Sequence, residues 1–138
     1  MRSKAPLVMM EQLVMVLVFA LTAALCVQVF ALSEKLSVKN AATDQAAMMA
    51  QNMAERMKSG NPETFLTESD AVSTVAGIWE FGFDEIWNVS RIENAEYYMK
   101  ICFEEENDLF WQARIHVFMK DGTELFSIPV AAQKLQEE

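Results

Sequence analysis

The stretch LVMMEQLVMVLVFALTAALCVQVFAL occupies residues 7–32, and the rest of the chain is organised around it. No charged residue occurs from Gln12 to Ser33, a run of 22 positions. A helix rises about 1.5 Å per residue, so this run reaches roughly 33 Å and can cross a hydrocarbon core of about 30 Å. The h-region of a cleaved signal peptide has only about 7–15 residues. Residues 7–32 are therefore predicted to be a retained transmembrane helix, and Glu11 is its only charged side chain.

The charges that flank this helix predict its orientation. Arg2 and Lys4 precede it, whereas acids and bases are nearly balanced just after it. Because an excess of Lys and Arg stays on the cytoplasmic side, residues 1–6 are expected inside the cell as a short leader and residues 33–138 outside the cytoplasmic membrane. Cleavage by a signal peptidase after Val29-Phe30-Ala31 is the less favoured alternative.

Composition limits the functions open to the part of the chain that follows the span. From Ser33 onward there are 9 Lys and Arg against 19 Asp and Glu, a net charge of −10. Such a surface repels nucleic acid and anionic lipid headgroups. Cys26 lies inside the span and Cys102 in an expected strand, so a disulfide framework is not expected.

The helix is expected to continue beyond the membrane through residues 33–61. No Gly or Pro interrupts residues 34–59, and Ser59-Gly60-Asn61-Pro62 is typical of a helix end. One apolar stripe follows the helical period on this segment: Ala42, Ala46, Met49, Ala50, Met53 and Met57. We expect Met49, Met53 and Met57 to pack the helix on the domain that follows.

Residues 62–138 are expected to form a small domain with one short helix, over residues 69–76, and an antiparallel sheet. From Gly77 the apolar residues recur at every second position, which is typical of half-buried strands. Polar residues 105–108 and the Asp121-Gly122 pair predict hairpin turns between strands. The fold class is thus α+β, with a long N-terminal membrane-spanning helix packed on a four-stranded antiparallel β-meander.

The sequence contains no recognisable catalytic, metal or cofactor site. His116 is the only histidine and lies among polar residues of an expected strand, without a partner for nucleophilic catalysis. Glu104, Glu105, Glu106 and Asp108 fall where a hairpin turn is expected, so a solvated acidic loop is favoured over a calcium site. We expect a protein that is not an enzyme and that needs no cofactor.

The layout resembles that of bacterial type IV pilins and pseudopilins. Members of that family have a short basic leader and an apolar run with one glutamate, and their long helix packs on an antiparallel sheet. Aligning the glutamates places the end of the leader between Pro6 and Leu7, with Glu11 as the fifth residue after it. Family leaders end in Gly, whereas this chain has Pro6, and Leu7-Val8 replaces the usual Phe-Thr. The resemblance therefore implies a noncanonical, minor pilin-like protein.

The resemblance also implies roles for individual residues and partners. Glu11 would act in subunit assembly by pairing with the cationic N-terminus of a neighbouring subunit, and a prepilin peptidase would cleave at Pro6-Leu7. Partners would be the membrane, other pilin-like subunits and the assembly machinery, with no nucleic acid. The alternative is that Glu11 reaches water or is protonated in a permanently anchored, single-pass extracytoplasmic binding module.

Overall fold

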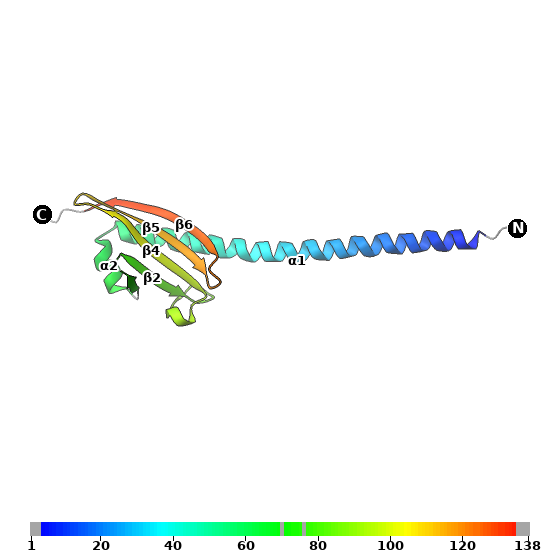
Figure 1. The fold of residues 1–138 in the computed structure, drawn as a ribbon, viewed down its shortest axis with the longest axis horizontal. Helices are drawn as coiled ribbons and strands as arrows, with labels where there is room; N and C mark the ends of the chain where they lie inside the picture. Colours follow the sequence, from blue (N-terminus) through cyan, green and yellow to red (C-terminus); the bar gives the residue numbers. More distant parts are fainter. Residues whose placement is uncertain (1–3, 70, 76, 135–138) are drawn as a thin grey trace. The chain divides into compact units, whose positions relative to one another are not determined.

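The computed structural model describes residues 4–69, 71–75 and 77–134 (Figure 1). The chain divides into two compact units, Met1–Asn40 and Ala41–Glu138. Helix α1 (Ala5–Lys58) supplies the described part of the first unit and continues into the second. Lys4 is the one predicted leader cation within the described residues, because Arg2 lies outside them.

The first unit is a fully exposed apolar helix. All described side chains from Lys4 to Asn40 are exposed, and the most apolar 18-residue window of α1 has a mean hydropathy of 2.6 with none of its residues buried. An exposed apolar surface of this length is unstable in water, because burial of apolar area is the main force that favours folding. Helix α1 is long and apolar enough to span a membrane.

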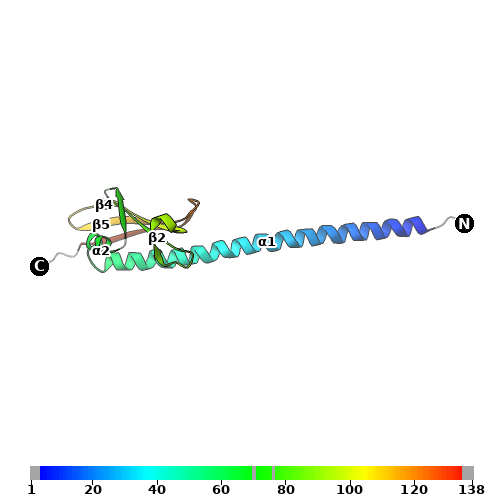
Figure 2. The same cartoon turned by 90° about the horizontal axis from the view of Figure 1, so that it is seen from below.

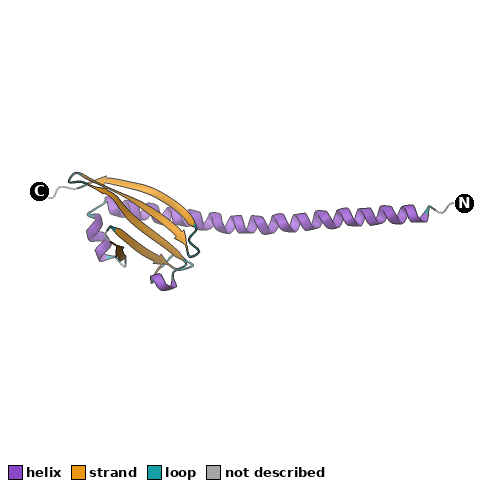
Figure 3. Ribbon diagram, in the orientation of Figure 1, coloured by secondary structure: helices purple, strands orange, loops and turns teal. Residues whose placement is uncertain are grey.

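In the second unit, residues 41–58 of α1 cover one face of an antiparallel sheet, as Figure 2 shows. The sheet has the order β1-β2-β4-β5-β6, and β3 pairs with β2 beside this path. Figure 3 distinguishes the strands, in orange, from the helices, in purple. The strands are β1 (Val72–Val75), β2 (Ile78–Phe83), β3 (Val89–Ser90), β4 (Tyr97–Glu106), β5 (Phe110–Met119) and β6 (Glu124–Gln133). A short 3-10 helix, Ile92–Asn94, lies between β3 and β4.

The core follows the predicted two-residue alternation closely. Along β5 the residues Trp111, Ala113, Ile115 and Val117 are buried, and the residues between them are only half-buried. Their cross-strand partners include Met99 and Ile101 on β4 and Ile128 and Val130 on β6. The α+β class and the antiparallel arrangement are confirmed, but the expected count of four strands is wrong, because β1 and β3 add to the sheet.

The expected helix over residues 69–76 is wrong. Helix α2 spans Pro62–Glu68 instead, and residues 72–75 form strand β1. Asn61 caps α2 by accepting a hydrogen bond from Glu63 N at 3.1 Å, and Pro62 occupies the first turn, where its missing N–H costs nothing. Asn61 therefore ends the connection that follows α1 and is the N-cap of α2. Asp70 and Ala76 of the expected helix lie outside the described residues.

Candidate functional site

Glu11 lies on the exposed apolar part of α1. Its neighbours one helical turn away, including Leu7, Val8 and Met15, are exposed apolar side chains. Within residues 4–69, 71–75 and 77–134, no hydrogen bond or ion pair reaches its carboxylate. A lone ionised carboxylate on an apolar helix is costly in a membrane, and an Asp at the centre of a membrane helix costs about 2.5–3.5 kcal/mol on insertion scales. In a membrane Glu11 therefore needs a partner that is not among these described residues, a proton or access to water.

Pro6 and Leu7, the expected cleavage position, lie in the first turn of α1. The helix begins at Ala5, so Pro6 occupies a position where proline is tolerated, and Val8 N donates to Lys4 O at 3.2 Å. The Pro6–Leu7 bond is thus part of a helical turn. A peptidase that needs an extended chain would have to open this turn, which is the least stable part of a helix.

The three predicted packing methionines differ in burial. Met57 is fully buried, whereas Met49 and Met53 are only partly buried against the core. Alanines carry most of the helix–sheet contact, in a row spaced four residues apart: Ala42, Ala46, Ala50 and Ala54. These small side chains are buried in the core between the helix and the sheet. Met49 and Met53 stand beside this row and line a surface groove.

This helix–strand groove is the most apolar concave surface that we find between α1 and the sheet. It has a volume of about 360 Å³, within the range of roughly 300–1,000 Å³ that is common for ligand sites. Its walls include Met49, Met53, Phe65, Phe81, Trp87 and Val89. Among the described residues that line it, only Arg56 is charged. In the described part of the chain its guanidinium forms no ion pair.

A tight loop holds Trp87 at one end of the groove. Asp84 Oδ1 accepts hydrogen bonds from Ile86 N at 3.0 Å and Asn88 N at 2.9 Å, and Trp87 N donates to Asp84 O at 3.1 Å. Trp87 has a φ of 64°, in the left-handed region that bulky residues rarely adopt. The loop thus holds Trp87 in a strained backbone conformation and fixes its indole against the sheet.

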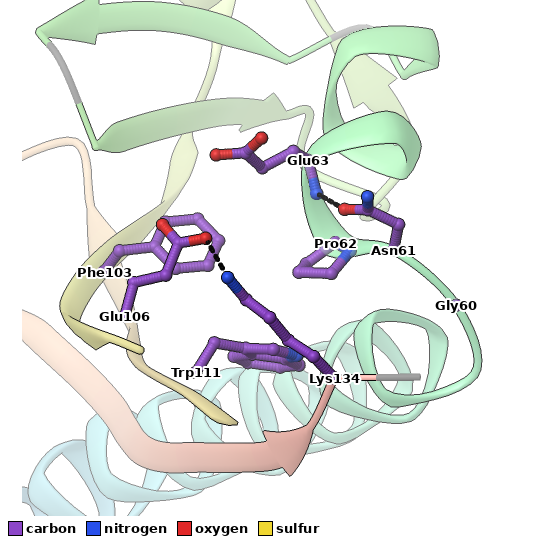
Figure 4. Close-up of a pocket in the computed structure, with 8 residues that line it drawn as sticks. All are labelled: Gly60, Asn61, Pro62, Glu63, Phe103, Glu106, Trp111 and Lys134. Carbon is purple, nitrogen blue, oxygen red and sulfur yellow. Dashed lines mark hydrogen bonds and ion pairs between the residues drawn. The ribbon is translucent and has the colours of Figure 1, made fainter. Parts of the chain in front are cut away.

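A second cavity, of about 530 Å³, lies between the α1–α2 connection and the turn end of the β4–β5 hairpin (Figure 4). Trp111 and Phe103 supply its apolar side, with ring centroids 6.1 Å apart. Lys134 Nζ and Glu106 Oε1 form an ion pair of 2.7 Å across it. The cavity thus holds one ion pair beside two aromatic rings.

The open face of the sheet carries ion pairs between neighbouring strands. Arg114 donates to Glu104 at 2.8 Å, and the hydrogen bond and charge of Glu104 raise the pKa of the Arg114 guanidinium. His116 Nδ1 lies 3.3 Å from Glu124 Oε1 on the same face. Within the described residues, no three His, Cys, Asp or Glu side chains are placed to bind a metal ion together. The predicted acidic residues are therefore partly structural, since Glu104 and Glu106 pair with cations.

No protein-family model, curated protein or solved structure matches this chain. The residues of the chain and their geometry are therefore the basis on which its function is inferred.

Sequence reasoning missed the helix–strand groove and the position of Arg56 in its lining. The period of α1 places Asn52 and Arg56 beside the apolar row, which is a weak signal for a groove rim. The pairing of Lys134 with Glu106, 28 residues earlier, has no local signal. Such a contact becomes visible only when the strand register is known.

Proposed function

We propose that this chain is a non-enzymatic, pilin-like subunit of a bacterial surface filament or secretion pseudopilus. The observation that carries the proposal is the difference between the two parts of α1. Residues 5–32 expose an apolar surface with one carboxylate, Glu11, and residues 41–58 pack on an antiparallel sheet. A subunit of this kind is stored in the membrane by its helix and assembles through the same helix.

The exposed apolar helix explains why assembly is needed outside the membrane. Lipid covers the side chains of residues 7–32 while the subunit is stored. When the helix leaves the bilayer, equivalent helices of neighbouring subunits are the natural replacement, because they bury the same apolar area. Glu11 then gains a cationic partner if the neighbour has a free N-terminus at Leu7.

Replacement of Glu11 by Gln tests this function. Glu11→Gln keeps the shape and removes the charge, so membrane insertion and the stability of residues 41–138 should be unchanged. Incorporation into filaments, or cross-linking to partner subunits, should fall strongly. The control is Glu34→Gln, which removes an exposed carboxylate of α1 outside the uncharged run. Mass spectrometry of the mature N-terminus shows whether cleavage at Pro6-Leu7 supplies the cation.

A permanently anchored extracytoplasmic binding module is the second candidate. The cavity at Trp111 and Lys134 favours it, because aromatic rings next to an ion pair suit a small amphipathic ligand. Normal assembly by Glu11→Gln, together with an intact N-terminus, would contradict the filament function and favour this module.

A further inference from the structure

We propose that the β4–β5 hairpin tip of one copy inserts into the helix–strand groove of a second copy, in a head-to-tail contact between sheet domains. The hairpin tip is defined by Asp108, Leu109 and Phe110. This proposal depends on the proposed function, because repeated head-to-tail contacts build open filaments.

The hairpin tip presents apolar side chains on a rigid support. Leu109 is 63% exposed and Phe110 is 39% exposed. The backbone beneath them is held, since Lys134 N donates to Leu109 O and Asn107 N donates to Phe110 O, both at 2.9 Å. A rigid projection loses little conformational entropy when it binds. Two adjacent apolar side chains on such a support are suited to enter an apolar groove.

The groove has complementary chemistry. Its walls are aromatic and methionine side chains, and methionine adapts its shape to an inserted group. The rim cation Arg56 has no carboxylate partner in the described part of its own copy, whereas Lys100, Lys120 and Lys134 are ion-paired. Glu105 beside the tip and Asp108 within it likewise have no cation partner among the described residues. Apolar insertion would supply affinity, and these charges would set the orientation.

The occupant must come from another copy. Met99 lines the groove and Glu106 precedes the hairpin tip, and both lie on β4. Seven residues of strand separate them by roughly 23 Å. The tip points beyond the far end of β4 and cannot fold back into its own groove. The contact therefore joins the hairpin tip of one copy to the groove of another.

Cross-linking in membranes tests the contact on the full-length chain. Two differently tagged copies are co-expressed with Cys26→Ala and Cys102→Ala, one carrying Asn107→Cys and the other Val89→Cys. Asn107 flanks the tip, and Val89 is 56% exposed in the groove wall, so the two thiols should come together when the tip enters the groove. Oxidation should give a disulfide between the two tagged copies. The control replaces Val89→Cys with Ala131→Cys, which is exposed on the opposite face of the sheet.

Charge exchange then tests the specificity. Arg56→Glu should lower the cross-link yield by about tenfold, and Glu105→Arg with Asp108→Arg in the other copy should restore it. Lys58→Glu, in the same helical turn but outside the groove lining, should have no effect. Equal yields with Val89→Cys and Ala131→Cys, or an unchanged yield with Arg56→Glu, would overturn the proposal. A specific cross-link without any filament would keep the contact and reject the filament function, whereas filaments without the cross-link would do the reverse.

Discussion

Trp87 stacks on Tyr97, with ring centroids 4.1 Å apart and ring planes 14° apart, although its own backbone has a φ of 64°. The stack joins the 84–88 loop to the first residue of β4. A left-handed conformation costs about 1–2 kcal/mol in a residue with a Cβ. The stacking and burial of the indole therefore have to offset this cost, and the loop keeps Trp87 at the end of the groove.

Two substitutions at Trp87 separate the ring contact from the backbone strain. Trp87→Ala removes the stack and keeps the strain, whereas Trp87→Gly removes both. We expect both variants to be destabilised, with Trp87→Gly more stable than Trp87→Ala by about 1 kcal/mol. Thermal unfolding of the full chain in detergent, followed by near-UV circular dichroism, measures the difference. If the alanine variant is the more stable one, the left-handed backbone is not strained.

Gly82 is expected to tolerate no side chain. A Cβ at this position would lie 2.8 Å from Ser90 O and 2.9 Å from Ala95 Cβ. Ser90 O is a backbone atom of β3, so relief would require moving that strand. Gly82→Ala should therefore cost about 1–3 kcal/mol. Gly60→Ala is the control, because an added Cβ there meets no atom within 4 Å. Similar melting temperatures for the two variants would contradict the packing of β3 on β2.

The packing of α1 on the sheet depends on the alanine row. Ala46 is fully buried, whereas Ala41 is an exposed alanine of the same helix. Ala46→Leu should destabilise the sheet domain by about 1–3 kcal/mol through overpacking, and Ala41→Leu should change its stability by no more than about 0.5 kcal/mol. Chemical unfolding of both variants gives the comparison. A stable Ala46→Leu variant would mean that the helix–sheet distance is adjustable.

The parts of the fold that have a strong local period could be predicted from the sequence. The apolar run made α1 recognisable, and the two-residue alternation placed the core residues of β4 and β5 correctly. Strands β1 and β3 were not predicted, because they have only four and two residues. Their pairing depends on the position of β2, which no local pattern specifies.

The candidate site was less accessible to sequence reasoning for a physical reason. Methionine stands out in a stripe, but the buried contact is made mainly by the less conspicuous alanines. Asn61-Pro62-Glu63 is a good helix start, yet it also follows a helix stop, and both interpretations fit the same letters. The groove arises where α1, α2 and β2 meet. Its residues, from Met49 to Met99, lie too far apart in sequence for a motif.

Alkaline titration should reveal the ion pair of Lys120 with Glu96. Their 2.9 Å contact raises the pKa of Lys120 above its usual 10.5, through the hydrogen bond first and the charge second. Because the folded-state pKa is the higher one, the pair stabilises the fold at neutral pH and loses this effect as the pH rises through the raised pKa. Glu96→Gln should lower the pKa of Lys120, measured by NMR at Nζ, and Glu93→Gln should leave it nearly unchanged. A Lys120 pKa that is insensitive to Glu96 would show that the pair does not persist in solution.

The proposed orientation, with residues 33–138 outside the cytoplasmic membrane, predicts which thiols an impermeant reagent can reach. The argument rests on Arg2 and Lys4 before the uncharged run. On a background of Cys26→Ala and Cys102→Ala, Asn107→Cys should react with a membrane-impermeant maleimide in intact spheroplasts. Ser3→Cys, which keeps both leader cations, should react only after the membrane is permeabilised. Both chains carry one thiol and the same span, so a difference in labelling reports sidedness alone. Reaction of Ser3→Cys but not of Asn107→Cys in intact spheroplasts would reverse the orientation. The sheet domain would then lie in the cytoplasm, where it cannot form part of a surface filament.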